Sequence, residues 1–448
     1  MLKTSFWGFS KPSVQYENLV SAPAVLKQID PPDQVSLLLD TSDFASIPPI
    51  ENGDILQCGQ LIAPDEDPSA GCVVPVSGTV NKLDSVEGDY GQTFHRVTVD
   101  VAEKKVDPAY AEKMENPDLA SAQPLFANFP GAPDLSAFID PEKNIHTLVV
   151  MGVDQDLLLG TQQYHVQNRL DAIDRGIALL RELTSVEKAV LVVVRDSLQN
   201  FGHLHADVLA VDRTYPSGSP DLVIQNVLHL DVPAGLSSED AGVVFISAEA
   251  AAAVGSASFS KAPAVDKVVT FVDSSGTRHL LSVPLGTPIS RVLATFKETL
   301  EENDRLIIGG PMTGRAIFSA DTPVQADTDG IMVQKAASIV HTSEYPCTNC
   351  GDCVQICPAN IAVNMLVRFL EAGQYETAAE EYDLLSCVDC GLCSFVCIAR
   401  IPIYQYIRLG KFELKRIQAA EAALAAEAET EAETEAEQNE TVAEEANE

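Results

Sequence analysis

The chain of 448 residues has no uninterrupted apolar run near the ~20 residues that a membrane-spanning helix needs. Its first ten residues also lack the apolar segment of a secretory signal, so we expect a protein that stays in the cytoplasm. Positive charge is scarce, with 29 Lys and Arg against 65 Asp and Glu, which gives a net charge of −36. Such a surface repels nucleic acid and anionic lipid. The acidity fits either high solubility or attraction of basic partner proteins, and composition does not separate the two.

The length corresponds to roughly three domains of about 150 residues each. Apolar residues make up 46% of the chain and charged residues 21%, which excludes wholesale disorder. The C-terminal tail differs from the rest, because from Glu421 onward it holds 11 Glu and no Lys or Arg. A segment of this kind cannot form a core. For residues 418–448 we therefore expect either a solvated helix or disorder, with disorder favoured.

Cysteine is rare outside one short region, since eight of the ten lie between Cys347 and Cys397. They form two copies of the spacing C-x2-C-x2-C-x3-C, and the first copy is followed by Pro358, as in bacterial ferredoxins. The second copy has Ile398 at that position. In the ferredoxin pattern the fourth cysteine of a run binds the other cluster. The pattern predicts two [4Fe–4S] clusters, one on Cys347, Cys350, Cys353 and Cys397, the other on Cys387, Cys390, Cys393 and Cys357.

Other uses of these cysteines fit less well. Disulfides require an oxidising compartment, and a single zinc ion prefers two separated cysteine pairs over four thiolates within eleven residues. The remaining pair, Cys58 and Cys72, lies in an apolar, strand-like region where free cysteine usually packs as a small core residue. No acid–base residue is predicted to be catalytic.

Four folding regions are expected before the tail, so the fold class is multidomain α+β. Residues 1–101 contain short strands in which apolar and polar residues alternate. The segments 51–56 and 75–80 look like a barrel-sandwich hybrid of the lipoyl type. The hairpin tip between them, Pro64–Pro68, has no lysine, so it cannot carry lipoate or biotin. Residues 102–140 are rich in Pro and Asp and are interpreted as a linker.

Residues 141–262 alternate buried strands with an amphipathic helix, which predicts an α/β domain. Residues 263–335 follow a strand–strand–helix–strand order, with a hairpin turn at residues 273–277, that suggests a β-grasp domain. Its loop Gly309–Gly314 has the outline of a P-loop, but Arg315 and Ala316 stand where Lys and Ser or Thr are required. We therefore expect no ATP binding there.

Residues 336–417 are expected to form an α-helical dicluster domain, because two helical stretches, separated by a break at Gly373, lie between the cysteine runs and a third spans Ile403 to Ile417. That third helix carries a group of basic residues, which either form a solvated face or dock onto an acidic partner or lipid headgroups. They are Arg408, Lys411, Lys415 and Arg416.

Three stretches carry a resemblance to a known family: residues 308–314, the two cysteine runs, and residues 401–409. With these motifs the chain resembles the C-subunit of the Rnf-type ion-translocating ferredoxin:NAD oxidoreductase. The resemblance implies a barrel-sandwich domain, an α/β domain like the flavin-bearing subunit of respiratory complex I, a β-grasp domain and a helical dicluster, in that order.

The family's flavin and NADH motifs are degenerate in this sequence. The stretch Leu125–Pro133, where the family has a glycine-rich loop, holds one glycine, and the acidic nicotinamide patch is reduced to Gly152–Asp156. The loop Tyr215–Asp221 has lost the residues that follow its Tyr-Pro-x-Gly, and Pro220 is expected to disturb the next helix start. We interpret this as loss of FMN and NADH binding, so no residue is assigned to either.

The resemblance implies a peripheral electron-transfer subunit at the cytoplasmic face of the cell membrane, which relays electrons through its two clusters. Expected partners are the other Rnf-type membrane and iron–sulfur subunits and a soluble carrier such as ferredoxin, with the membrane reached only through partner subunits. Two alternatives stay open. One is an NADH-oxidising, FMN-containing subunit of the same complex, and the other is a soluble dicluster adaptor of the heterodisulfide-reductase type.

Overall fold

The computed structural model describes residues 13–17, 25–40, 50–63, 71–88, 91–115, 117–343 and 345–445. The chain divides into two compact units, which are treated separately below: residues 12–340 and, with the cysteine motifs, residues 341–448. The hairpin tip Pro64–Pro68 lies outside the described residues. The architecture is mixed α/β and multidomain.

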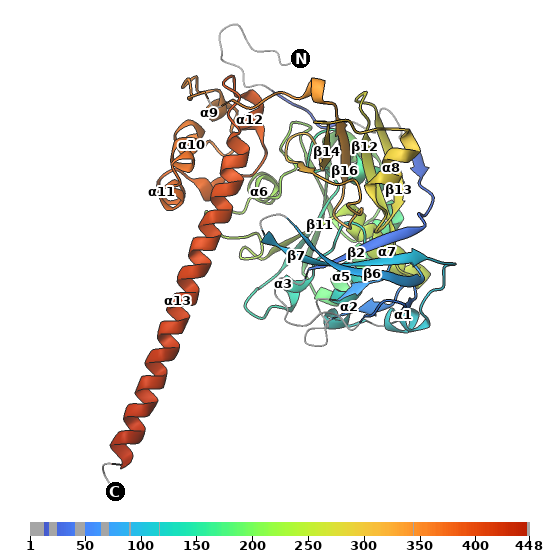
Figure 1. Cartoon of the computed structure of the whole chain (residues 1–448), viewed down its shortest axis with the longest axis horizontal. Helices are drawn as coiled ribbons and strands as arrows, with labels where there is room; N and C mark the ends of the chain where they lie inside the picture. The colour runs from blue at the N-terminus through green and yellow to red at the C-terminus, as the bar shows by residue number, and fades with distance from the viewer. Residues whose placement is uncertain are drawn as a thin grey trace. The chain divides into compact units, whose positions relative to one another are not determined.

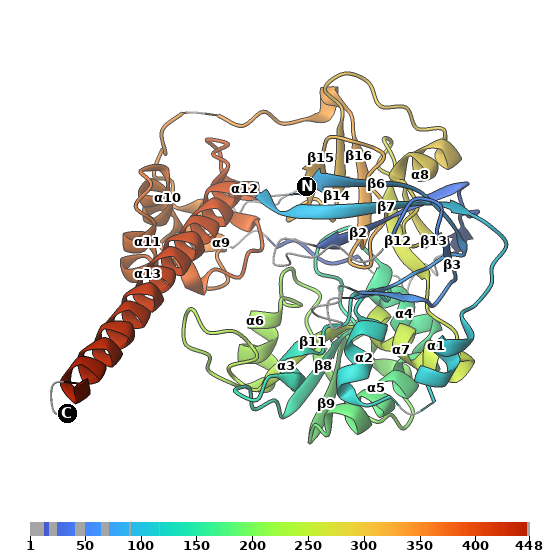
Figure 2. The same cartoon turned by 60° about the horizontal axis from the view of Figure 1, so that its bottom comes forward.

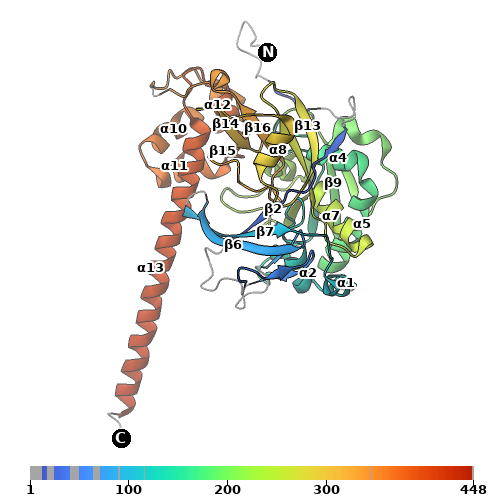
Figure 3. The same cartoon turned by 45° about the vertical axis from the view of Figure 1, so that its right-hand side comes forward.

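The first β region has the strand order β2-β7-β6-β3 with a separate pair β4-β5. Its strands alternate buried and exposed positions, and Val35, Val97 and Val99 are at most 1% exposed in its core. The antiparallel β6 and β7 form the long ribbon visible in Figure 3. The strands are β2 (Gln34–Asp40), β3 (Ile55–Leu56), β4 (Leu61–Ile62), β5 (Cys72–Val73), β6 (Gly78–Glu87) and β7 (Thr93–Val101).

Residues 102–140 are more than a linker. Leu125, Phe126 and Phe129 are at most 1% exposed, and they pack in the same core as the strands that follow. In the sequence, the many Pro and Asp residues suggested a loop and concealed this apolar face. In the structure, Pro begins one helix and Asp caps two of them. The helices are α1 (Pro108–Lys113), α2 (Leu119–Phe126) and α3 (Ser136–Ile139).

A parallel sheet follows, in the order β10-β9-β8-β11. Its central strands are buried on both faces, as their continuous apolar runs predict. Figure 2 shows α5 and α7 beside this sheet. The elements are β8 (Thr147–Met151), α4 (Thr161–Asn168), α5 (Leu170–Thr184), β9 (Lys188–Val194), β10 (Asp207–Val211), α6 (Pro220–Val223), β11 (Val243–Ser247) and α7 (Ala248–Ser260).

Two glycines set the distance between α5 and α7. A Cβ at Gly176 would lie 1.9 Å from the carbonyl oxygen of Ala251, and one at Gly255 would lie 2.0 Å from that of Ala172. The two helix backbones therefore touch directly, and any side chain at these positions would force them apart.

The next sheet is mixed, with the order β1-β13-β12-β16-β14-β15. The hairpin β12–β13 turns at residues 273–277, as predicted, and β16 inserts between β12 and β14, parallel to β12. The elements are β1 (Leu26–Gln28), β12 (Asp266–Val272), β13 (Arg278–Pro284), α8 (Ile289–Phe296), β14 (Arg305–Ile308), β15 (Arg315–Ile317) and β16 (Gly330–Gln334). Short 3-10 and π turns lie at Arg195–Asn200, Ile224–Leu228, Ala336–Ser338 and Leu384–Ser386.

The unit with the cysteine motifs is helical, and Gly373, with φ of 71°, separates its two middle helices as the sequence predicts. A Cβ at Gly410 would lie 2.4 Å from a methyl group of Leu370, so α13 packs closely on α10 (Figure 1). The helices are α9 (Asp352–Ile356), α10 (Val363–Glu371), α11 (Tyr375–Glu381), α12 (Leu392–Val396) and α13 (Ile403–Glu445).

Helix α13 does not end near Ile417 but continues to Glu445. Of the two states expected for the tail, the structure thus has the helix and not the favoured disorder over the described part. Ala and Glu are both strong helix formers, which accounts for the extension.

Candidate functional site

The two cysteine motifs fold as two copies of one loop–helix unit. Asn349 and Asp389 have φ of 59° and 49°, and Gly351 and Gly391 have φ of 82° and 71° directly before α9 and α12. Left-handed residues turn the chain sharply and point successive backbone N–H groups inward. The two loops therefore have the form that iron–sulfur ligand loops require.

One pocket in this unit is lined by cysteines of both motifs: Cys347, Cys350 and Cys353 from the first and Cys397 from the second. The pKa of the Cys353 thiol is raised to about 11, mainly by burial and further by the nearby Cys347, Cys350 and Cys397. The four sulfur groups are thus close enough to interact. Apolar side chains complete the wall, among them Val367, Ile398, Ile401 and Ile403.

The other four cysteines also lie near one another. Burial raises the pKa of Cys393, and Cys387, Cys390 and, from the first motif, Cys353 raise it further. Burial likewise raises the pKa of Cys390 to about 11, and Cys357 from the first motif adds to this shift. The pocket contains the first of the two predicted ligand groups, and Cys357 lies near Cys390 of the second. The crossed assignment of all eight cysteines stays a prediction.

The donor set fits iron–sulfur clusters. The eight thiol groups of the two motifs are soft ligands of the type that these clusters require. The backbone N–H of Asn349 donates a hydrogen bond of 3.4 Å to Sγ of Cys347, as amides do around cluster sulfurs. Across the described ranges, no three His, Cys, Asp or Glu side chains meet closely enough to hold a single metal ion.

A charged pair distinguishes the second motif from the first. Nζ of Lys411, on α13, donates hydrogen bonds to the carbonyl oxygen of Cys387 at 2.7 Å and to Oδ2 of Asp389 at 2.6 Å. The pKa of the Cys387 thiol is raised to about 12, mainly by burial; Asp389 raises it further and Lys411 lowers it. The sequence showed Lys411 only as one of four basic residues on a helix, because its contact depends on how α13 packs.

Cys58 and Cys72 lie apart from these groups, in the core of the first β region. Sγ of Cys58 donates to the carbonyl oxygen of Pro75 at 3.3 Å. Burial raises the pKa of both thiols, that of Cys72 to about 12. Both are buried free thiols, as expected for core residues.

The acidic patch that the resemblance associates with nicotinamide is turned inward. Asp154 and Asp156 are 1% and 2% exposed. Asp156 accepts hydrogen bonds from the backbone N–H groups of Met312 and Thr313 and from the Thr313 hydroxyl. The glycine-rich loop Gly309–Gly314 therefore already holds an anion, which is the carboxylate of this chain's own Asp156.

The other two degenerate motifs are also filled by protein. Gly131, in the stretch Leu125–Pro133, packs so closely on α7 that a Cβ would lie 2.3 Å from Oγ of Ser247. The backbone N–H of Gly218, in the loop Tyr215–Asp221, donates to the hydroxyl of the buried Tyr16 at 3.1 Å. At both positions the glycine backbone is in contact with other parts of this chain.

One expectation about that loop was wrong. Pro220 does not disturb the following helix, because it is the first residue of α6. Proline is tolerated at this position, since the first N–H of a helix has no intrahelical partner.

A buried charge cluster was missed in the sequence. Lys267 is fully buried and forms ion pairs with Glu249 and, at 2.6 Å, with Asp329. The ring of His165 lies beside Glu249, with Nε2 3.4 Å from Oε1. His165 lies on α4, Glu249 on α7, Lys267 at the start of β12 and Asp329 directly before β16, so only the fold brings them together. The cluster connects α4 and α7 to the mixed sheet.

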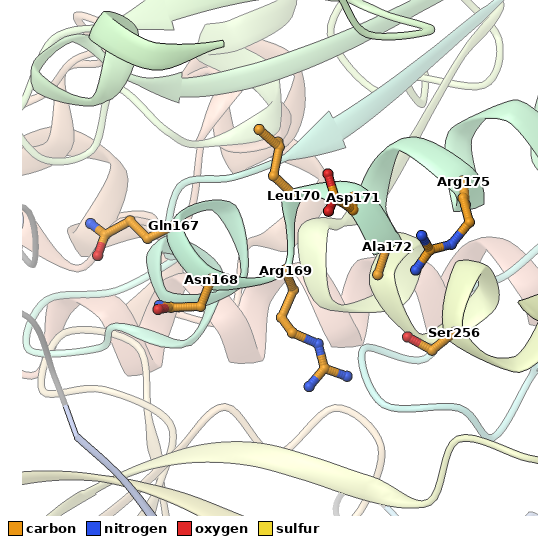
Figure 4. Close-up of a pocket in the computed structure, with 8 residues that line it drawn as sticks. All are labelled: Gln167, Asn168, Arg169, Leu170, Asp171, Ala172, Arg175 and Ser256. Carbon is orange, nitrogen blue, oxygen red and sulfur yellow. The ribbon is translucent and has the colours of Figure 1, made fainter. Parts of the chain in front are cut away.

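The first unit also has a hollow of about 470 Å³ where α4, α5 and α7 meet (Figure 4). The guanidinium groups of Arg169 and Arg175 and the hydroxyl of Ser256 line it. It shares no residue with the cysteine motifs or with the degenerate flavin and NADH motifs.

Residues 346–402 match the 4Fe-4S dicluster domain family. The chain is similar to the C-subunit of the ion-translocating oxidoreductase complex of Pseudomonas aeruginosa (28% identity, covering 82% of this chain and 50% of the relative) and of Rhodobacter capsulatus (27%, 74% and 69%). It is also similar to the C-subunit of the proton-translocating ferredoxin:NAD(+) oxidoreductase complex of Clostridium ljungdahlii (27%, 94% and 96%). The chain thus spans about half the length of the Pseudomonas relative.

Among solved structures, the chain is similar to NAD+-reducing [NiFe]-hydrogenase in its air-oxidized state, with 13% identity and a TM-score of 0.38 over 61% of this chain and 56% of the other. The H2-reduced state gives a TM-score of 0.40. In the part of the chain that the structure describes, every helix is too short or too polar to cross a membrane. The curated relatives confirm the resemblance seen in the sequence: the chain is similar, over most of its length, to the C-subunits of ion-translocating oxidoreductase complexes.

Proposed function

We propose that this chain is a peripheral electron-transfer subunit of an Rnf-type ion-translocating complex. The observation that carries the proposal is the pocket lined by Cys347, Cys350, Cys353 and Cys397, which joins cysteines of two motifs around one space. The second group, Cys387, Cys390, Cys393 and Cys357, supports a second site of the same kind. We assign one [4Fe–4S] cluster to each group. When bound, such clusters supply one-electron transfer.

The residues of the chain have three tasks at these sites. The thiolates bind iron, the loop amides donate to sulfur, and the buried side chains of the helical core exclude water. Cys350 is exposed, whereas Cys353, Cys357 and Cys393 are buried, so the first site lies nearer to solvent at one edge. That edge is suited to exchange electrons with an external carrier.

The proposed domains keep the boundaries expected from the sequence with two exceptions: residues 102–140 pack in the core of the α/β region, and β1 joins the later mixed sheet. The strand order β13-β12-β16-β14-β15 around α8 supports a β-grasp domain at residues 263–335. The parallel sheet of β8–β11 supports a complex-I-flavoprotein-like domain at 141–262, and the first sheet with its β4-β5 pair supports a barrel-sandwich domain within 1–101. Residues 336–417 would be the dicluster domain, with the helical tail beyond.

The proposed subunit does not bind FMN or NADH. Asp156 occupies the amides of the glycine-rich loop, and Tyr16 and Ser247 pack against the other two degenerate motifs. We therefore place electron entry at a soluble carrier such as ferredoxin and electron exit at the membrane subunits of the complex, with this chain held at the cytoplasmic face through those partners.

Cofactor analysis of the full chain, purified without oxygen, tests the proposal. We expect iron and acid-labile sulfide for two clusters, no stoichiometric flavin, and visible absorbance that bleaches with reduced ferredoxin but not with NADH. Stoichiometric FMN with bleaching by NADH would instead establish the flavin-containing alternative. A chain that holds only zinc, or no reducible centre, would overturn the proposal altogether.

A further inference from the structure

The two cysteine motifs repeat with an offset of 40 residues, but their surroundings differ in charge. Asn349 and Asp389 occupy equivalent positions with similar backbone angles. Oδ1 of Asn349 accepts a neutral hydrogen bond of 2.9 Å from the side-chain amide of Asn364. Asp389 instead forms an ion pair with Lys411. At the position equivalent to Lys411, 40 residues earlier, the first repeat has Glu371.

Lys411 is placed to act on the second cysteine loop. Its side chain is 26% exposed, and its ammonium bridges the backbone of Cys387 and the carboxylate of Asp389. The other carboxylate oxygen, Oδ1 of Asp389, is buried and has no hydrogen-bond partner among the described residues. Loss of the ammonium would therefore leave a partly buried negative charge uncompensated beside the loop.

We propose that Lys411 is a positioning residue that holds the loop Cys387–Cys390 and keeps the reduction potential of its centre above the value that Asp389 alone would impose. Reduction adds one negative charge to a cluster, and a nearby cation stabilises that charge while a carboxylate opposes it. The first centre lies next to a neutral Asn pair, so no such ion pair acts on its reduction potential. The two centres are therefore unequal, although their cysteine spacings are identical. This inference rests on the proposed function, because it requires both clusters.

A redox titration of the full chain, followed by electron paramagnetic resonance, measures the effect. In Lys411→Gln we expect the reduction equilibrium of one centre to become about tenfold less favourable, which is ~59 mV for one electron. The reduction potential of the other centre should not change. In Lys411→Arg, which keeps the positive charge, the potential of that centre should stay close to the wild-type value. Lys415→Gln is the matched control, because Lys415 is an exposed residue of the same helix.

Asp389→Asn gives an independent result of opposite sign. It leaves the ammonium in place and removes the opposing carboxylate, so the potential of the same centre should rise. This variant decides the matter if Lys411→Gln fails to retain iron. Unchanged potentials in both variants at full iron content, or a fall in Asp389→Asn, would overturn the inference while leaving the proposed function intact. A wild-type chain without reducible clusters would instead contradict the proposed function.

Discussion

The carboxylate of Asp156 accepts two hydrogen bonds of 2.7 Å from Thr313, one from its backbone N–H and one from its hydroxyl. Asp156 follows the first strand of the parallel sheet, and Thr313 lies in the glycine-rich loop of the next domain, 157 residues later. A loop that could cradle a phosphate thus holds an internal carboxylate. This contact also connects the loop after β8 with the loop after β14, so its loss affects stability.

Asp156→Ala should destabilise the first unit by about 2–3 kcal/mol, because charge-assisted bonds are lost and buried donors are left unpaired. Urea unfolding followed by circular dichroism measures this. Asp171→Ala is a suitable control, since Asp171 is an exposed residue of α5. Equal free energies of unfolding in both variants would show that Asp156 is not a structural anion.

The stability contributed by Asp154 should depend on pH. Burial raises its folded-state pKa to about 6, against about 3.9 in an unfolded chain. The folded state therefore holds this proton more tightly, so the contribution is full below about pH 4 and is lost as pH rises through about 6. Relative to Asp154→Asn, the wild-type free energy of unfolding should fall by about 2 kcal/mol between pH 4 and pH 7. Parallel pH profiles of the two proteins would contradict the assignment.

Cysteine pairs test the crossed sharing of ligands. Cys350→Ala and Cys397→Ala lie in different motifs but should each remove the same cluster, about half of the iron. The double variant should then lose no more iron than either single one. Cys350→Ala combined with Cys357→Ala should lose nearly all of it. If the first pair lost all iron and the second pair half, each motif would bind its own cluster. Iron and sulfide analysis of anaerobically purified protein distinguishes these patterns.

The contact between α5 and α7 predicts a cost for any side chain at Gly176. A Cβ there would lie 1.9 Å from a backbone oxygen of the facing helix, so Gly176→Ala should destabilise the protein by about 1–3 kcal/mol through overpacking. Gly202→Ala is the matched control, because Gly202 has no atom within 4 Å of such a Cβ. Thermal unfolding of the two variants gives the comparison, and equal midpoints would mean that the helices can move apart freely.

The sequence was most informative where chemistry depends on local spacing. Gly373 predicted the break between helices, and the apolar runs predicted β8 and β9. The cysteine runs predicted a dicluster domain, and residues 346–402 match that family. The sequence was less informative about residues 102–140, where Pro and Asp concealed a buried face that includes Phe126. The expectation that Pro220 would disturb a helix was wrong for a related reason. Whether proline breaks or begins a helix depends on where the helix starts.

The sequence by itself determined the ligand types, their spacing and the degeneracy of the flavin motifs, because each of these depends only on residues that are close together along the chain. Only the tertiary structure decided which groups are paired across the chain: Asp156 with Thr313, Lys267 with Asp329, and Lys411 with the second cysteine loop. Such contacts depend on how helices and sheets pack, and packing joins residues whose separation along the chain gives no sign that they will meet.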